Sequence, residues 1–306
     1  MGNMNKIMKK KIVTHSGNFH TDEVFACAVL SLLYDGNVEI VRSRDPEVWA
    51  TGDYVVDVGG EYDSARGRFD HHQIGGAGKR ENDIPYSSFG LVWKEYGEKL
   101  CGGTYQSYYI DEKLVQPVDT ADNGINTFDL TEKKIFPYLL HHVVTAFRPT
   151  WREESEHEMS FDEGFAHAVG VAKQVLLREI VIAKDDFEGE AAVVDLYHKS
   201  ADKRVVVVDG QYPWERALSQ FPEPLYVVKP DHENGGKWKV KTVRERIDSF
   251  ESRKPFPSVW AGKSGKELAE TTGVPDSIFC HTKLFIAVAG SKEGALKLAH
   301  LAVDAE

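Results

Sequence analysis

Cysteine and long apolar runs are both scarce in this sequence of 306 residues. Its three cysteines, Cys27, Cys101 and Cys280, are an odd number without metal-type spacing, so neither a disulfide framework nor a zinc ribbon is expected. A protein of the reducing cytoplasm fits this composition. The longest apolar stretch, residues 24–34, falls short of the roughly 18–20 residues that a membrane span needs. We therefore expect no membrane association and no export signal.

Basic residues are also in deficit. The chain has 37 Lys and Arg against 48 Asp and Glu, a formal net charge of −11. A uniformly acidic surface repels long polyphosphates, so stable binding of duplex DNA is not expected. Acidic residues can still be concentrated around a cation, and bound metal then attracts phosphate.

The order of predicted elements indicates an α/β fold in two domains. Short β-branched runs at residues 11–15, 38–41 and 54–58 alternate with expected helices at about 22–34 and 87–96, which favours a mostly parallel sheet. A further helix is predicted over 136–147. In such sheets ligands bind beyond the carboxyl ends of the strands.

The predicted boundary between the two domains lies at residues 159/160. Four glutamates between 152 and 158 suggest a solvated linker, and Ser160 with Glu163 forms the capping box of a long helix to about residue 184. Residues 1–159 would form the first domain. Residues 160–306 would form the linking helix and a second, smaller α/β domain.

Histidine and aspartate recur in four blocks at predicted strand ends or loops. Their ring nitrogens and carboxylate oxygens suit manganese, zinc, iron or cobalt, whereas the absence of thiolate argues against a structural zinc knot. Carboxylates crowded together are costly unless a cation compensates them. We therefore predict a metal site rather than four unrelated turns. The blocks are HSGNFHTDE at 15–23, VVDVGG at 55–60, RFDHHQ at 68–73 and VDTADNG at 118–124.

These blocks resemble the four motifs of the DHH phosphoesterase superfamily, which is named for the sequence seen here at Asp70-His71-His72. Within it, the chain is similar to the MYG (melanocyte-proliferating-gene) family of metal-dependent hydrolases. The likeness extends through residues 147–151 and 279–281 to 293–296. It implies a DHH-type metal-binding catalytic domain at the N-terminus and a substrate-clamping domain at the C-terminus.

The resemblance also implies two divalent ions, with manganese favoured and magnesium, zinc or cobalt as alternatives. The first motif departs from related nucleases and pyrophosphatases, because His20 replaces an aspartate and one extra residue precedes it. Either His15 or His20 could then be the principal ligand. Spacing does not separate Asp119 from Asp122, and we favour Asp119. The implied ligands are His15, His20 and Asp57 for one ion, and Asp22, Asp57, His71 and Asp119 for the other, with Asp57 bridging.

Four further residues are candidates for substrate binding or catalysis. His72 would donate to a phosphate oxygen or to the leaving group, or would instead support Asp70. Ser252-Arg253-Lys254 resembles a phosphate-gripping segment of manganese pyrophosphatases, which implies substrate binding by Arg253 and Lys254. His281 is the other substrate-binding candidate. Alternating lysines at 237, 239 and 241 are interpreted as a solvated edge strand.

Together these features predict a metal-dependent phosphoesterase. The expected activity is that of a 3′–5′ exoribonuclease, acting on single-stranded RNA or short oligonucleotides through metal-activated water, with Asp57 and His72 in catalytic roles. The direction comes from the resemblance alone. A small-molecule pyrophosphatase or nucleotide phosphatase, and a non-catalytic nucleotide- or metal-binding protein, are the alternatives. The native metal, the preference for RNA or DNA and the oligomeric state are left open.

Overall fold

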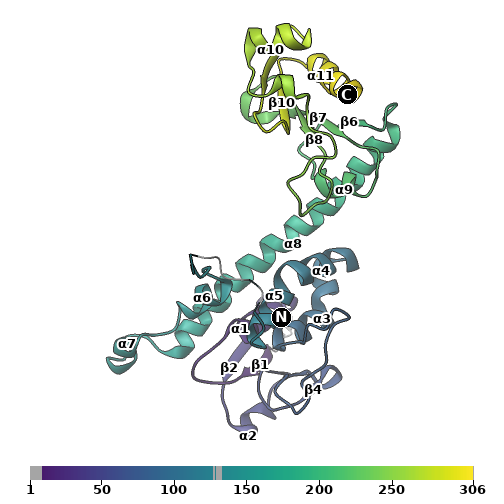
Figure 1. Ribbon diagram of the computed structural model, residues 1–306. Helices are drawn as coiled ribbons and strands as arrows, with labels where there is room; N and C mark the ends of the chain where they lie inside the picture. The colour runs from purple at the N-terminus through teal and green to yellow at the C-terminus, as the bar shows by residue number, and fades with distance from the viewer. Residues whose placement is uncertain (1–8, 127, 129–132, 306) are drawn as a thin grey trace, which may run out of the picture. The chain divides into compact units, whose positions relative to one another are not determined.

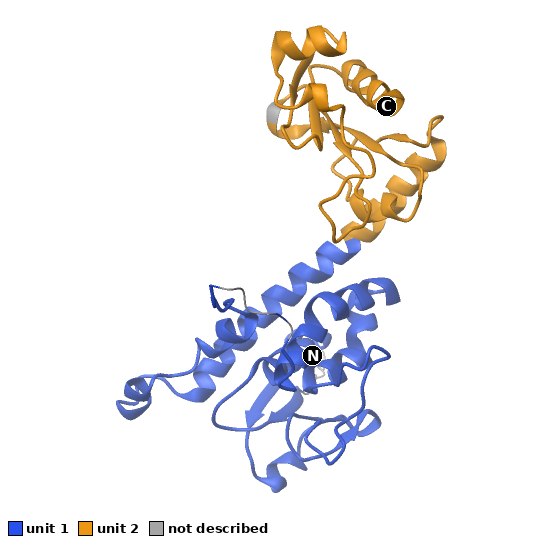
Figure 2. Cartoon of the chain, in the orientation of Figure 1, with its two compact units in different colours: residues 1–184 blue, residues 185–306 orange. Residues whose placement is uncertain are grey.

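A computed structural model of the chain describes residues 9–126, 128 and 133–305. The chain forms two compact units, residues 1–184 and 185–306 (Figure 2). Each unit contains one five-stranded sheet with helices, so the predicted α/β class is confirmed (Figure 1). Within the part of the chain described, no helix is both long and apolar enough to cross a membrane.

The sheet of the first unit is mostly parallel, as predicted. Its strand order is β2-β1-β3-β5-β4, and only β4, at the edge, runs antiparallel to its neighbour. Buried Val and Ile side chains on the inner strands account for this, because a parallel sheet is covered on both faces. Consequently the loops that follow β1, β3 and β5 open at one edge of the sheet. The strands are β1 (Lys10–Thr14), β2 (Val38–Arg42), β3 (Tyr54–Val56), β4 (Tyr62–Asp63) and β5 (Arg68–Phe69).

Two long helices provide much of the core of this unit. Helix α1 (Thr21–Leu33) is buried along almost its whole length and packs against α3 (Ser88–Cys101). The helix predicted over 136–147 is shorter than expected. Only α6 (Leu140–Thr145) forms, because Pro137 disfavours helical backbone at the residue before it. The other helical segments are α2 (Pro46–Trp49), η1 (Ser64–Arg66), α4 (Thr104–Ile110), η2 (Asp111–Val115), α5 (Gln116–Asp122) and α7 (Trp151–Ser155).

Helix α8 (Phe161–Lys199) belongs to both units. The predicted capping box is present: the Glu163 amide donates to Ser160 Oγ at 3.2 Å, and the Ser160 amide donates to the Glu163 carboxylate at 2.8 Å. The helix continues beyond the predicted end near residue 184. Its first part buries residues such as Leu176 in the first core, and its last part buries Val193 and Tyr197 in the second. The division at 184/185 therefore falls inside this helix, 25 residues after the boundary expected from composition.

The second unit has the strand order β6-β7-β8-β10-β9, in which only β6 and β7 are parallel. The interpretation of the alternating lysines as an edge strand was wrong, because β8 pairs on both sides, with β7 and β10. Lys239 instead forms an ion pair with Asp231 at 2.8 Å. The elements are β6 (Val205–Val207), α9 (Glu215–Ser219), β7 (Tyr226–Asp231), η3 (His232–Asn234), β8 (Lys237–Thr242), η4 (Ser258–Trp260), α10 (Gly265–Thr272), β9 (Ser277–Cys280), β10 (Ile286–Ala289) and α11 (Lys292–Asp304).

Candidate metal centre

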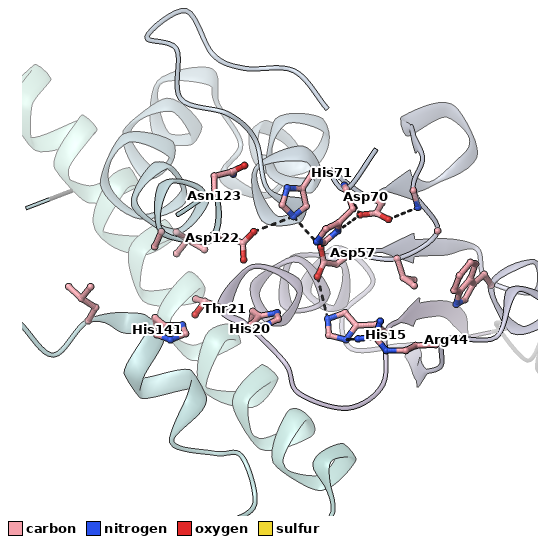
Figure 3. A pocket seen from close by; sticks show the side chains of 18 residues that line it. His15, His20, Thr21, Arg44, Asp57, Asp70, His71, Asp122, Asn123 and His141 are labelled. Carbon is pink, nitrogen blue, oxygen red and sulfur yellow. Dashed lines mark hydrogen bonds and ion pairs between the residues drawn. The ribbon is translucent and has the colours of Figure 1, made fainter. Parts of the chain in front are cut away.

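The loops at the carboxyl edge of the first sheet enclose a pocket of about 870 Å³. It is built by the loops after β1, β3 and β5, the start of α1 and the end of α5, which brings together all four sequence blocks. Figure 3 shows side chains from these separate segments pointing toward one another. Segments far apart in the sequence therefore converge on one small volume.

Asp57 stands at the middle of this site. It follows β3 directly and has a φ of 56°, a left-handed conformation that is uncommon for a residue other than glycine. One carboxylate oxygen lies 3.3 Å from His15 Nε2 and the other lies 3.4 Å from His71 Nε2. The Ser88 hydroxyl also donates to Asp57, at 2.9 Å. The side chain thus faces both histidines, as a bridging ligand would.

Glu23 completes the His15 side and was missed as a site residue. Its buried carboxylate lies 3.1 Å from His15 Nε2 and also accepts from the His20 amide at 2.8 and 2.9 Å. The signal was visible in the sequence, but an acid at the third position of a helix is more simply interpreted as a cap. Here one carboxylate both caps α1 and faces the histidine.

Asp22 is the residue that points most strongly to a metal site. The residue is fully buried, and neither of its carboxylate oxygens has a hydrogen-bond partner. Burial raises its pKa well above the usual range, and the nearby carboxylates of Asp57 and Asp122 raise it further. An orphaned buried carboxylate among other carboxylates costs stability unless a positive charge joins them. The residues present therefore fit a divalent metal.

The histidines respond to the same crowding. Burial lowers the pKa of His15, but Asp57 and Glu23 outweigh burial and raise it to about 10. Burial likewise lowers the pKa of His71, and contacts with Asp122 and Asp57 raise it to about 10. Burial raises the pKa of Asp57, yet the two histidines bring it below its usual range. Positive charge is thus held between these carboxylates even without an ion.

Among the residues that the structure describes, three groups of side chains each place their ligand atoms within 4.8 Å of one another. All donors are imidazole nitrogens or carboxylate oxygens, and no thiol contributes, since the three cysteines are buried outside these groups. Asp57 joins the first group to the second, and His20 joins the first to the third. The groups are His15, His20, Glu23 and Asp57; Asp57, His71 and His72; and His20, Asp22 and Asp122.

The structure places Asp122, and not the favoured Asp119, beside the histidines of the centre. Asp122, the last residue of α5, lies 3.2 Å from His71 Nε2. Asp119 is fully buried, and its carboxylate accepts from Ser87 Oγ at 2.5 Å, from the Gly90 amide at 3.0 Å and pairs with Arg80 at 2.7 Å. These partners occupy Asp119 and anchor α5 to α3. Asp122 is therefore the carboxylate of this block that reaches the centre.

His72 is oriented by Asp70. Its Nδ1 donates to Asp70 at 2.8 Å, and its backbone amide donates to the same carboxylate oxygen at 3.1 Å. Asp70 also accepts from the Gly60 amide at 2.5 Å, which fixes the turn beside Asp57. The two roles predicted for His72 are thus compatible. Asp70 uses Nδ1, and Nε2 is left for a substrate.

The predicted substrate residues of the second unit have partners within that unit. Arg253 donates to the carbonyls of Phe221, Pro224 and Ser219 at 2.5, 3.1 and 3.2 Å. Lys254 Nζ donates to two carbonyls at the end of the chain, at 2.9 and 2.6 Å. His281 Nδ1 accepts from the Lys283 amide at 3.0 Å. The contacts of Arg253 and Lys254 tie this segment to α9, to the loop after it and to the end of α11, and substrate binding by the three residues stays a prediction.

Known proteins of similar sequence show the family to which the chain belongs. The sequence model of the MYG1 exonuclease family, described as "Uncharacterised protein family (UPF0160)", matches residues 11–303. The chain belongs to this family. It is 32% identical to the MYG1 exonuclease of Mus musculus over 328 residues, which cover 96% of this chain and 85% of that protein. It is 31% identical to a MYG1 protein of Schizosaccharomyces pombe, covering 98% and 99% of the two chains.

The human MYG1 exonuclease is 32% identical over 324 residues, which cover 94% of this chain and 84% of the human protein. A solved structure of an exopolyphosphatase-related protein from Bacteroides fragilis aligns over 97% of this chain with 11% identity and a TM-score of 0.24, which is too low to support an argument. The predicted membership of the MYG family is confirmed by the sequence relatives.

Proposed function

We propose that this protein is a metal-dependent phosphoesterase that removes nucleotides from the 3′ end of single-stranded RNA or short oligonucleotides. The observation that carries the proposal is the buried, unpartnered carboxylate of Asp22 beside Asp57, His71 and Asp122. Relatives over nearly the full length are named exonucleases, which supports the same reaction class.

Two divalent cations are proposed, with manganese first among the candidates. Such ions, when bound, lower the pKa of water toward neutrality and neutralise charge on a phosphoryl transition state. Asp57 faces both ligand groups, and Glu23 is added to the residues predicted from the sequence. The proposed ligands are His15, His20, Glu23 and Asp57 on one side, and Asp22, Asp57, His71 and Asp122 on the other.

The chain's own groups would position the substrate and move a proton. Ser88 fixes the Asp57 carboxylate, and the strained backbone of Asp57 turns it toward both histidines. Asp70 holds His72 through Nδ1, so that Nε2 can donate to a phosphate oxygen or to the departing oxygen. The hydrogen bond with Asp70 raises the pKa of His72 above its usual value, which favours the protonated ring.

The test follows the shortening of labelled RNA. Wild-type protein with manganese is expected to release mononucleotides at once from a 3′-labelled oligomer and to give a descending ladder from a 5′-labelled one. Asp57→Asn and Asp122→Asn should lose nearly all turnover, whereas Asp35→Asn, at an exposed aspartate that does not line the pocket, is the matched control and should keep it. Equal turnover by wild type and Asp57→Asn would overturn the proposal. Phosphate release from pyrophosphate without shortening of oligomers would assign the centre to a small substrate instead.

A further inference from the structure

The segment after β2 brings two side chains to the metal pocket that have no part in the proposed chemistry. Arg44 and Trp49 both line the pocket. Among the described residues around it, Arg44 is the only lysine or arginine, while Asp57, Asp70 and Asp122 are acidic. An anionic substrate therefore meets a single fixed cation from the chain at this site.

Arg44 is held with its guanidinium beside His15 (Figure 3). Its Nε donates to the Ser16 carbonyl at 3.2 Å, and its Nη2 lies 3.3 Å from His15 Nδ1. His15 Nδ1 also lies 3.3 Å from the Ser16 carbonyl. When His15 uses Nε2 as a ligand, Nδ1 carries the proton and donates to that carbonyl, so it cannot accept from Arg44. The two terminal nitrogens of Arg44 are then left to bind an oxyanion, which a guanidinium does bidentately.

Trp49 is the last residue of the short helix α2, which Asp45 caps by accepting from the Glu47 amide at 2.9 Å. The indole Nε1 donates to the Ser43 carbonyl at 2.9 Å, so its polar atom is satisfied and its orientation is set. The ring lies beside the turn after Asp57, since a Cβ placed on Gly59 would come within 3.8 Å of it. A partly exposed indole fixed in this way offers a face on which a base can stack.

We propose that Arg44 and Trp49 form a nucleotide subsite next to the metal centre. Arg44 binds a backbone phosphate and Trp49 stacks on the base of the same nucleotide. This inference rests on the proposed function and adds what recognises the substrate. It would explain the proposed preference for a single strand by one stacking surface, because a base stacked in a duplex cannot present its face to Trp49.

The experiment compares three small probes that contain no internucleotide bond: adenosine 5′-monophosphate, ribose 5-phosphate and adenosine. Their dissociation constants are measured by calorimetry on the manganese-loaded protein. Arg44→Gln should weaken the two phosphate-bearing probes by about 10- to 100-fold and leave adenosine unchanged. Trp49→Ala should weaken the two base-bearing probes by about 5- to 100-fold and leave ribose 5-phosphate unchanged, and Trp49→Phe should recover most of that loss.

Arg178→Gln and Trp151→Ala are the matched controls, because both side chains are exposed and neither lines the pocket. Both should bind all three probes as the wild type does. The inference is overturned when Arg44→Gln or Trp49→Ala affects the three probes equally, or affects none of them. The proposed function fails separately, when the wild type shortens no oligonucleotide. Cleavage by wild type with unchanged KM in both variants would reject the subsite and keep the enzyme.

Discussion

Replacing each of the two aspartates of α5 in turn separates metal binding from folding. Asp122 is 20% exposed and faces His71, whereas Asp119 is completely buried against Arg80, Ser87 and Gly90. We expect Asp122→Ala to weaken manganese binding and Asp119→Ala to destabilise the fold. The two effects should not be interchangeable, although the residues are three positions apart.

The magnitudes follow from the contacts. Removing one partner of a buried ion pair costs about 3–5 kcal/mol, because the other charge is left uncompensated. For a unit of this size, each kcal/mol lowers the melting temperature by about 2–4 °C, so Asp119→Ala should lower it by about 6–20 °C. Loss of Asp122 should weaken manganese binding by at least the roughly 10- to 100-fold measured for the outer partners of metal ligands. Without metal, Asp122→Ala removes a carboxylate that repels Asp22 but also one that pairs with His71 at 3.2 Å, so we expect only a small change in stability.

Two measurements decide between the roles. Titration calorimetry gives the affinity for manganese, and thermal unfolding in a chelator gives the stability of the metal-free protein. Asp119→Asn is a useful companion, because it keeps the shape of the side chain while removing its charge. The reasoning is refuted if Asp119→Ala keeps its melting temperature and loses manganese binding, or if Asp122→Ala behaves as proposed for Asp119.

Four other predictions concern the metal and the second unit. Manganese at 100 times its dissociation constant should stabilise the protein by about 2.7 kcal/mol, and EDTA should reverse the rise in melting temperature. Asp22→Asn should stabilise the metal-free protein, since it removes an unpartnered buried charge. It should also abolish the rise in melting temperature that manganese causes, and a destabilised variant would contradict this reasoning. Glu23→Gln should weaken manganese binding by about 10-fold or more while circular dichroism keeps its helix signal, and unchanged affinity would remove Glu23 from the centre. Arg253→Ala should lower the urea stability of the second unit by about 1.5–3 kcal/mol and leave KM unchanged, because its guanidinium binds three carbonyls; a raised KM at full stability would restore its predicted role.

The arrangement of the first unit was predictable because local pattern and chain topology agree. Alternation of short β-branched strands with helices specifies parallel pairing, and parallel pairing places the residues after β1 and β3 at one edge. His15 and Asp57 could therefore be expected together before any coordinate was known. The second sheet was less predictable, since it combines one parallel pair with antiparallel ones, and β9 pairs with β10 across a register shift at Val288 and Ala289.

The choice between Asp119 and Asp122 could not be made from spacing. Both lie near the end of one short helix, and what separates them is Arg80, a residue about forty positions earlier whose side chain reaches Asp119. Glu23 was missed for a related reason. A carboxylate at that position of a helix can be a cap or a metal ligand, and the local sequence does not distinguish the two roles. Long-range partners, which no local pattern encodes, decide which acid is structural and which is free to bind an ion.

A structural consequence links these assignments. The left-handed backbone of Asp57 and the unpartnered carboxylate of Asp22 each cost stability in the absence of a cation. Close packing nevertheless holds both in place, because α1 is buried along nearly its whole length and β3 lies inside the sheet. The packing of these neighbouring elements therefore stabilises an arrangement of ligands that is unfavourable without metal. Metal binding would reduce that cost. Substitutions that loosen the packing of α1 against α3 should therefore weaken manganese binding, even though they replace none of the ligands.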